Sequence, residues 1–294
     1  MLGGQAPIRY PARMATLLAL LSSLLWGSAD YHAGNLSKRL PTMVVLAVNQ
    51  TFGLLFGVFL ILVSGGWIAP SLASSGYFIN GALAGLCGYA GLLCLYAGLS
   101  SGRMGVVSPI SSLSVLIPLF FALVVKGDQL STPVTMGVIA AIIGGFLASG
   151  PEITQGLPFK PVLLALGAAL GFGSALTFMA IGSQESSLLT MTTMRATTFI
   201  VSAAYFLKVR TGGGLGKRDI PMLAAIGVAD FSANLLLGVA TTKGLVSIAM
   251  VLGSLYPIAT AVLAYIFLHE RLHKAQYVGV LLAVGGVALI SSLQ

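Results

Sequence analysis

Charged side chains are scarce in this sequence. Asp, Glu, Lys and Arg together make up 7% of the 294 residues, whereas about 25% is usual in soluble domains. So few charges could not cover the surface of a soluble protein of this length, and apolar residues account for 57% of the chain. The composition excludes an ordinary soluble enzyme or nucleic-acid-binding domain and indicates a chain that lies in a lipid bilayer.

Cysteine is nearly absent, and the matches to familiar catalytic motifs lie in unsuitable contexts. Cys87 and Cys94 are seven residues apart in one predicted helix, too far apart to form a disulfide with each other. The sequence has no CxxC motif. Residues 269–273 match HExxH, but they lie in a predicted connection beside Arg271 and Lys274, which argues against a metal site. Residues 98–102 match GxSxG, but they lie where two predicted membrane helices meet and not between a strand and a helix. Residues 211–217 resemble a phosphate-binding loop, but the spacing is one residue short and Arg218 replaces the required Ser or Thr. The sequence therefore predicts no catalytic residue, metal site or cofactor.

Long apolar runs are abundant. A helix of about 20 apolar residues crosses the hydrocarbon core of a bilayer, and Gly, Pro and Ser clusters separate runs of this length along the whole chain. We therefore predict an all-α polytopic membrane protein with ten transmembrane helices. The predicted spans are 13–35, 42–64, 77–99, 104–126, 132–149, 160–182, 187–207, 219–241, 244–267 and 275–292.

The first helix of the chain returns in its second half. The segment 17–20 (LLAL), followed by Gly27-Ser28-Ala29, recurs as 163–166 with Gly173-Ser174-Ala175, at an offset of 146 residues. Self-similarity at a fixed offset indicates a duplicated unit. We therefore predict two repeats, residues 1–150 and 151–294, each of five helices.

The end of each repeat also matches, at an offset of 142. Asp128 corresponds to Glu270, and two glycines seven residues apart follow each of these acids. An odd number of helices per repeat makes the two repeats enter the membrane from opposite sides, as in many secondary transporters. The prediction is two inverted five-helix repeats around a central cavity. The matched glycines, which suit close helix contact, are Gly137 with Gly279 and Gly144 with Gly286.

Lysine and arginine are unequally distributed between the two sides. With ten helices, ten of these residues fall in the odd-numbered connections and four on the other side. Cytoplasmic connections carry the excess of basic residues. The count predicts that the odd connections are cytoplasmic and that both termini lie outside.

Several motifs together resemble one transporter family. They are Trp26-Gly27-Ser28 on the first helix, Tyr256-Pro257 on the ninth, and Glu270 with Leu272 in the turn that follows. With the duplication, they make the chain similar to the EamA-type transporters of the drug/metabolite transporter superfamily, and within it to amino-acid exporters of the YddG type. The resemblance implies a ten-helix basket with a central cavity that exports or exchanges small metabolites.

Three ionisable residues lie well inside predicted spans, namely Asp30, Arg195 and Asp230. Charges in hydrocarbon are costly, so such residues are candidates for function. Arg195 and Asp230 both fall near the membrane midplane, where they could pair, or could bind the carboxylate and the amine of a substrate. The offset of 146 makes Asn49 the repeat mate of Arg195.

Asp30 stands beside Tyr31 and His32 towards one end of the first helix. A carboxylate next to an imidazole could relay a proton. Adjacent residues point in different directions on a helix, however, so a polar cluster that anchors the helix at the interface is the alternative.

The fourth and ninth helices contain proline together with hydroxyl residues. Proline frees a backbone carbonyl, which a hydroxyl or a ligand can satisfy, and it lets a helix bend. Interhelical hydrogen bonding is the alternative role for the hydroxyls, and packing is the alternative for the aromatics. The further cavity candidates are Trp26, Tyr89, Tyr96, Ser108, Ser111, Phe172, Ser247, Met250 and Ser254, and the candidate hinges are Pro109, Pro118 and Pro257.

These features predict a secondary transporter of the inner membrane, working by alternating access on small amphipathic metabolites. Amino acids, including aromatic and apolar ones, are the best-matching substrates. A nucleotide-sugar or phosphosugar exchanger would need several basic residues in the cavity, and a drug exchanger of the same superfamily stays open. An intramembrane enzyme would need clustered catalytic groups. The expected partners are the substrate and the bilayer, with no nucleic acid, and we expect a monomer.

Overall fold

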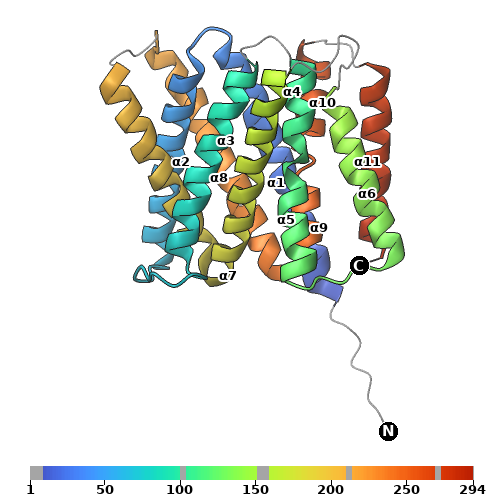
Figure 1. Cartoon of the computed structure of the whole chain (residues 1–294). Coiled ribbons are helices and arrows are strands. Elements are labelled where there is room, and N and C mark those ends of the chain that lie inside the picture. The colour runs from blue at the N-terminus through green and yellow to red at the C-terminus, as the bar shows by residue number, and fades with distance from the viewer. Residues whose placement is uncertain (1–8, 100–103, 151–158, 210–213, 269–272, 294) are drawn as a thin grey trace.

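The structure is a computed structural model that describes residues 9–99, 104–150, 159–209, 214–268 and 273–293 (Figure 1). Its described residues form helices that run roughly parallel or antiparallel to one another. The helical elements are α1 (Arg9–Ser37), α2 (Thr42–Ser64), α3 (Tyr77–Leu99), α4 (Met104–Ser112), the 3₁₀ turn η1 (Leu113–Val115), α5 (Leu116–Phe120), the π-helical turn η2 (Phe121–Val125), α6 (Thr132–Ala148), α7 (Phe159–Val209), the 3₁₀ turn η3 (Lys217–Asp219), α8 (Ile220–Lys243), α9 (Val246–Gly253), α10 (Tyr256–Leu268) and α11 (Lys274–Ser292).

Seven segments of the described chain are long and apolar enough to cross a membrane, and two apolar helices are shorter. One of the seven, residues 159–204, has 46 residues, which would extend about 70 Å if straight, twice the thickness of the hydrocarbon core. It is not straight, because Ser186 has an extended backbone (φ −159°, ψ 110°). A Cβ built on Gly182 would lie 2.7 Å from Oγ1 of Thr190, so the two halves of α7 lie side by side.

The chain begins and ends at the same end of the bundle. The start of α1 and the end of α11 lie at the end where α7 turns and where α2 connects to α3 (Figure 1). This arrangement agrees with an even number of crossings. It places the described parts of the first and seventh connections, residues 38–41 and 214–219, together at the opposite end. The cytoplasmic position of that end stays a prediction.

Matched contacts show that the two repeats are inverted relative to each other. A Cβ on Gly144 would lie 2.7 Å from the carbonyl oxygen of Gly279, and a Cβ on Gly137 would lie 3.0 Å from that of Gly286. The offset of 142 relates Gly144 to Gly286 and Gly137 to Gly279. Each contact therefore maps onto the other, with the two helices exchanged. The helices α6 and α11 therefore pack antiparallel about a pseudo-two-fold axis, along the glycines that the sequence predicted.

The first helix of each repeat packs against the broken helix of the other repeat. Gly27 on α1 contacts the Tyr256 carbonyl on α10, and a Cβ on Gly173 would lie 2.5 Å from the Ser114 carbonyl in η1. Gly27 and Gly173 are mates at offset 146, and Ser114 and Tyr256 are mates at offset 142. Each half thus completes the packing of the other.

Both of these partner helices are interrupted at matched positions. The 3₁₀ turn η1 breaks the fourth predicted span between α4 and α5, and a turn at 254–255 separates α9 from α10. Pro109 lies inside α4, and Pro118 and Pro257 lie just after the two breaks. The positions suit hinges, and the gating role of these three prolines stays a prediction.

Asp128 connects the two repeats at the end of the bundle that contains the chain ends. It follows η2, and its Oδ2 accepts hydrogen bonds from the backbone N–H and the hydroxyl of Ser247, at 2.9 Å and 2.7 Å. Ser247 is the second residue of α9, where backbone N–H groups lack helical partners. The carboxylate therefore caps a helix that belongs to the other repeat.

Replacing Asp128 with alanine is expected to destabilise the protein, because the buried Ser247 hydroxyl and N–H lose their acceptor. Loss of a helix cap costs about 1–2 kcal/mol, or roughly 2–8 °C in melting temperature for a chain of this size. The measurement is thermal unfolding in detergent. The neighbouring Gln129→Ala, at an exposed position, is the control, and equal melting temperatures for the two variants would contradict the assignment.

At the opposite end an ion pair joins the connection after α1 to η3. The Arg39 guanidinium donates to Asp219, whose side chain is buried and also accepts from the N–H of Gly216. The hydrogen bond from Arg39 lowers the pKa of the Asp219 carboxyl below its ordinary value of 3.8. This contact agrees with both connections lying on one side of the membrane.

The lowered pKa of Asp219 predicts an acid-dependent contribution to stability. A carboxylate with a depressed folded-state pKa stabilises the fold fully above its unfolded pKa and loses that effect as the pH falls through the folded value. We expect the wild type to melt above Asp219→Asn at about pH 6 and the difference to shrink as the pH falls below 3.8. A pH series of melting curves tests this, and a difference that grows in acid would contradict it.

Candidate functional site

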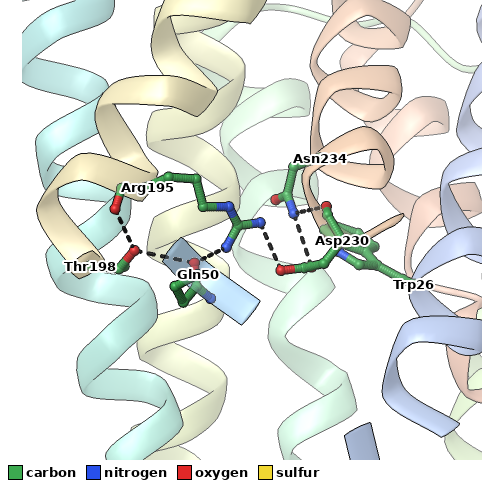
Figure 2. Close-up of polar contacts among 6 residues, drawn as sticks. All are labelled: Trp26, Gln50, Arg195, Thr198, Asp230 and Asn234. Atoms are coloured by element: carbon green, nitrogen blue, oxygen red, sulfur yellow. Dashed lines mark hydrogen bonds and ion pairs between the residues drawn. The ribbon is translucent and has the colours of Figure 1, made fainter. Parts of the chain in front are cut away.

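A group of polar side chains lies inside the bundle where α1, α2, α7 and α8 meet (Figure 2). Two of these helices come from each repeat. We call this group the Arg195 cluster, and it consists of Trp26, Gln50, Arg195, Thr198, Asp230 and Asn234.

Arg195 forms the centre of the cluster. Its side chain is 3% exposed, and its Nη2 lies 2.9 Å from Oδ2 of Asp230 as an ion pair. Nη1 donates to Oε1 of Gln50 at 2.5 Å. Thr198, one turn further along α7, donates to the same oxygen at 3.2 Å. Of the two arrangements considered from the sequence, the structure shows Arg195 and Asp230 paired with each other.

The second carboxylate oxygen of Asp230 is also occupied. Oδ1 accepts from Nε1 of Trp26 at 2.9 Å and from Nδ2 of Asn234 at 3.3 Å. Asn234 also donates to the backbone carbonyl of Asp230 at 2.7 Å. The Trp26 ring packs edge-on against Tyr256 of α10, with centroids 6.0 Å apart. Asp230 is therefore held from three sides, by α7, by α1 and by its own helix.

Some buried polar atoms in and beside the cluster have no hydrogen-bond partner among the described residues. Nε and Nη2 of Arg195 are buried without an acceptor in hydrogen-bonding geometry, although Nη2 is close enough to Asp230 to form an ion pair. Oδ1 of Asn49, next to Gln50, is buried without a donor. Unpaired buried polar atoms are rare and costly, so they favour a site that receives a polar ligand or water.

Small residues bring the four helices close enough to form the cluster. Gly227 on α8 packs directly against the Asn49 carbonyl of α2, where no Cβ would fit. A Cβ on Gly53 of α2 would lie 3.6 Å from Cδ of Arg195. Arg195 and Asp230 can therefore meet although they come from different helices.

Asn49, the predicted repeat mate of Arg195, lies beside the cluster but does not bind Arg195. Its backbone carbonyl packs against Gly227, and it is the next residue, Gln50, whose side chain accepts from Arg195. The correspondence of Asn49 with Arg195 across the repeats stays a prediction.

Gln50, Thr198 and Asn234 did not stand out in the sequence. They are neutral, and neutral polar residues are common in membrane helices, so neither rarity nor charge marks them. The available signal was spacing. Thr198 lies three residues after Arg195, and Asn234 lies four after Asp230, which places each pair on one helix face.

Four predicted hydroxyl and methionine candidates lie away from the Arg195 cluster. Ser247 is bound to Asp128, and Met250 is fully buried in the apolar core. Ser111 and Ser254 donate to carbonyls of their own helices, Val107 at 2.8 Å and Val251 at 2.7 Å. In this conformation Met250 could not touch a substrate, so its role and that of the three serines stay predictions.

The remaining aromatic candidates are separated from Trp26. Phe172, the repeat mate of Trp26, packs against Gly91 of α3, where a Cβ would lie 2.9 Å from Cδ1 of the ring. Tyr89 is half-buried on α3. The side chains of Tyr96 and Ser108 lie outside the described residues.

One cavity of about 250 Å³ lies at the end of the bundle near the start of α1, far along the helix from the Arg195 cluster. It is lined in part by Gln129, Val134 and Ile248. Its lining contains no charged side chain, so the cluster has the stronger claim to be the functional site.

Comparison with known proteins supports a single family. A sequence profile of the EamA-like transporter family matches residues 13–150 and again residues 159–292. No curated protein matches the sequence. Among 29 matching solved chains, one described as a crystal structure of a protein aligns with a TM-score of 0.78 over 95% of this chain and 97% of that chain. Its 18% identity shows a shared fold. Because the family profile matches nearly the whole chain in two consecutive segments, the protein belongs to the EamA-like transporter family.

Proposed function

We propose that the protein is a secondary transporter that moves small amphipathic metabolites by alternating access, with amino acids as the substrate class. The observation that carries this proposal is the Arg195 cluster, a charged group inside the membrane at the junction of two inverted repeats. Transporters with inverted repeats bind substrate at the repeat interface near the midplane. The proposed architecture has ten crossings around this site, in the inner membrane, with odd-numbered connections in the cytoplasm and the monomer as the working unit.

The charges of the cluster favour zwitterions over anions. Arg195 is the one buried basic side chain among the described residues of the helices, and Asp230 already neutralises it. A phosphosugar or nucleotide sugar carries more than one negative charge and would meet a site without net positive charge. An amino acid brings both signs, and its carboxylate could accept from the unpaired Nε of Arg195.

The aromatic side chains favour apolar or aromatic amino acids, as in exporters of the YddG type. Trp26 and Tyr256 stand edge to face beside the charged groups. Such rings present apolar surface to a substrate side chain while the charged groups hold its polar head. The matched breaks between α4 and α5 and between α9 and α10 would let the two repeats move around the site.

Counterflow in liposomes tests the proposal. Purified protein is reconstituted with one unlabelled amino acid inside, and uptake of the labelled form is followed for a panel that includes phenylalanine, leucine and glutamate. We expect saturable counterflow of at least one apolar or aromatic amino acid and none in protein-free liposomes. Exchange of sugar phosphates without any amino acid would favour the phosphosugar alternative, and flux that does not saturate would indicate a channel.

A further inference from the structure

Asp30 is an exposed carboxylate on the inner side of a membrane helix. The outer face of α1 is marked by Leu17, Leu21 and Leu24, which are 49–61% exposed. At 3.6 residues per turn, Asp30 points to the side opposite Leu21. That is the side of Ala19, which is fully buried. Asp30 is nevertheless exposed, so the side chains packed on α1 leave its carboxylate uncovered.

The position of Asp30 places it one turn from the Arg195 cluster. Trp26 is four residues earlier on the same face of α1, and it donates to Asp230. Asp30 interacts electrostatically with Asp230 and with the Tyr256 hydroxyl. Asp30 therefore lies at the accessible end of the cluster, close to the rings of Trp26 and Tyr256.

Asp30 has no cationic partner in the part of the chain that the structure describes. Among the described residues, no Lys, Arg or His side chain lies within ion-pair distance of it, whereas Arg195 is paired with Asp230. Of the elements packed on α1, α8 contributes Asp230 and the distant Lys243, and α10 contributes Tyr256 and the exposed Tyr265. No titratable residue occurs in α2 or α9.

The formal charge of the site is therefore negative, with two carboxylates and one guanidinium. An uncompensated charge in the membrane interior is costly, and a bound cation removes that cost. Both oxygens of Asp230 are already occupied by Arg195, Trp26 and Asn234, so Asp230 cannot readily bind an additional ammonium group. Asp30 can bind an ammonium group, and an ammonium at this position would also face the aromatic rings, which attract cations.

We propose that Asp30 binds the positively charged amino group of the transported molecule. The Nε–H of Arg195, which has no acceptor among the described residues, would then meet the acceptor group of that molecule, deeper in the cluster. The substrate class is thus amino compounds, with the amino group required. This inference rests on the proposed function and assigns the amine to Asp30 in place of Asp230.

Three ligands on one scaffold test the inference with the full-length protein in nanodiscs. They are phenylalanine, phenethylamine, which lacks the carboxylate, and phenylpropionate, which lacks the amine. If counterflow identifies a different amino acid, that amino acid and its matched amine and acid replace them. Binding is measured by calorimetry for the wild type, Asp30→Asn, Asp30→Glu and the matched control Asp219→Asn, which changes an aspartate outside the Arg195 cluster.

The wild type should bind phenylalanine and phenethylamine and reject phenylpropionate. Asp30→Asn should weaken the binding of phenylalanine and phenethylamine about 10- to 100-fold, which corresponds to the loss of a charge-assisted hydrogen bond. It should not weaken the binding of phenylpropionate. Asp30→Glu should recover part of the affinity, and Asp219→Asn should match the wild type. Equal phenylalanine affinity for the wild type and Asp30→Asn, or wild-type binding of phenylpropionate as tight as that of phenylalanine, would overturn the inference and leave the transporter assignment standing. A wild type that transports no amino acid would instead overturn the proposed function.

Discussion

Replacing Arg195 with alanine should reduce transport at least 100-fold, to near background. The change leaves the Asp230 carboxylate without its counter-ion and Oε1 of Gln50 without its shortest donor. Removing one partner of a buried ion pair costs about 3–5 kcal/mol. The Asp230 side chain is 22% exposed, so water will reduce the cost. Transport counterflow and melting temperature are measured on the same preparation.

A double substitution separates a structural pair from a substrate-binding residue. Arg195→Ala combined with Asp230→Asn removes the unpaired charge, so the melting temperature should recover most of its loss. If Arg195 contributes to substrate binding, transport stays absent in the double variant. If the pair is only structural, transport returns together with stability. Arg39→Ala, which removes an arginine from a connection outside the cluster, should transport normally.

The architecture could be predicted because the apolar pattern of the sequence is regular and repeats. Spans of membrane length and the two offsets indicated two inverted units, and the glycines that matched across them meet between α6 and α11. Interruptions within a span were harder to place. Pro109 and Pro118 indicated that the fourth span bends, but a proline does not say whether the backbone continues as α, 3₁₀ or π helix. Neighbouring helices decide that.

The candidate site could be predicted only where charge marks it. Arg195 and Asp230 stood out because an ionised side chain in hydrocarbon is costly, and a partner or a function must offset that cost. Asn49 was found at the right depth, but it is the next residue, Gln50, whose side chain binds Arg195. A repeat offset could not show this, because neighbouring residues point in different directions on a helix.

Helical spacing also could not show whether one side of a helix faces a cavity or the packed core. Ser247, Met250 and Ser254 follow one another at intervals of three and four residues, which predicts that they lie on one side of a helix. The structure breaks that helix at 254–255 and buries Met250 completely. A stripe on a helix can face a cavity or the packed core, and only the neighbouring helices distinguish the two.

Gly144→Ala and Gly286→Ala should each destabilise the protein strongly and by similar amounts. A Cβ on Gly144 would lie 2.5 Å from the backbone nitrogen of Ala283, and one on Gly286 would lie 2.6 Å from the carbonyl oxygen of Gly137. Backbone atoms cannot rotate away as a side chain can, so α6 and α11 must separate. Overpacking of this kind costs about 3 kcal/mol, or roughly 6–12 °C in apparent melting temperature.

Alanine substitutions at the adjacent glycines are the controls, because they should not lower the stability of the protein. A Cβ on Gly145 would lie 3.7 Å from Leu255, in ordinary contact, and one on Gly285 would meet nothing within 4 Å. Alanine is favoured over glycine inside a helix by about 1 kcal/mol, so Gly145→Ala and Gly285→Ala should leave stability unchanged or raise it. Because the two-fold axis makes Gly144 and Gly286 equivalent, similar losses at both follow from the inverted repeat itself. A large loss at one with none at the other would show that α6 and α11 are not related in this way.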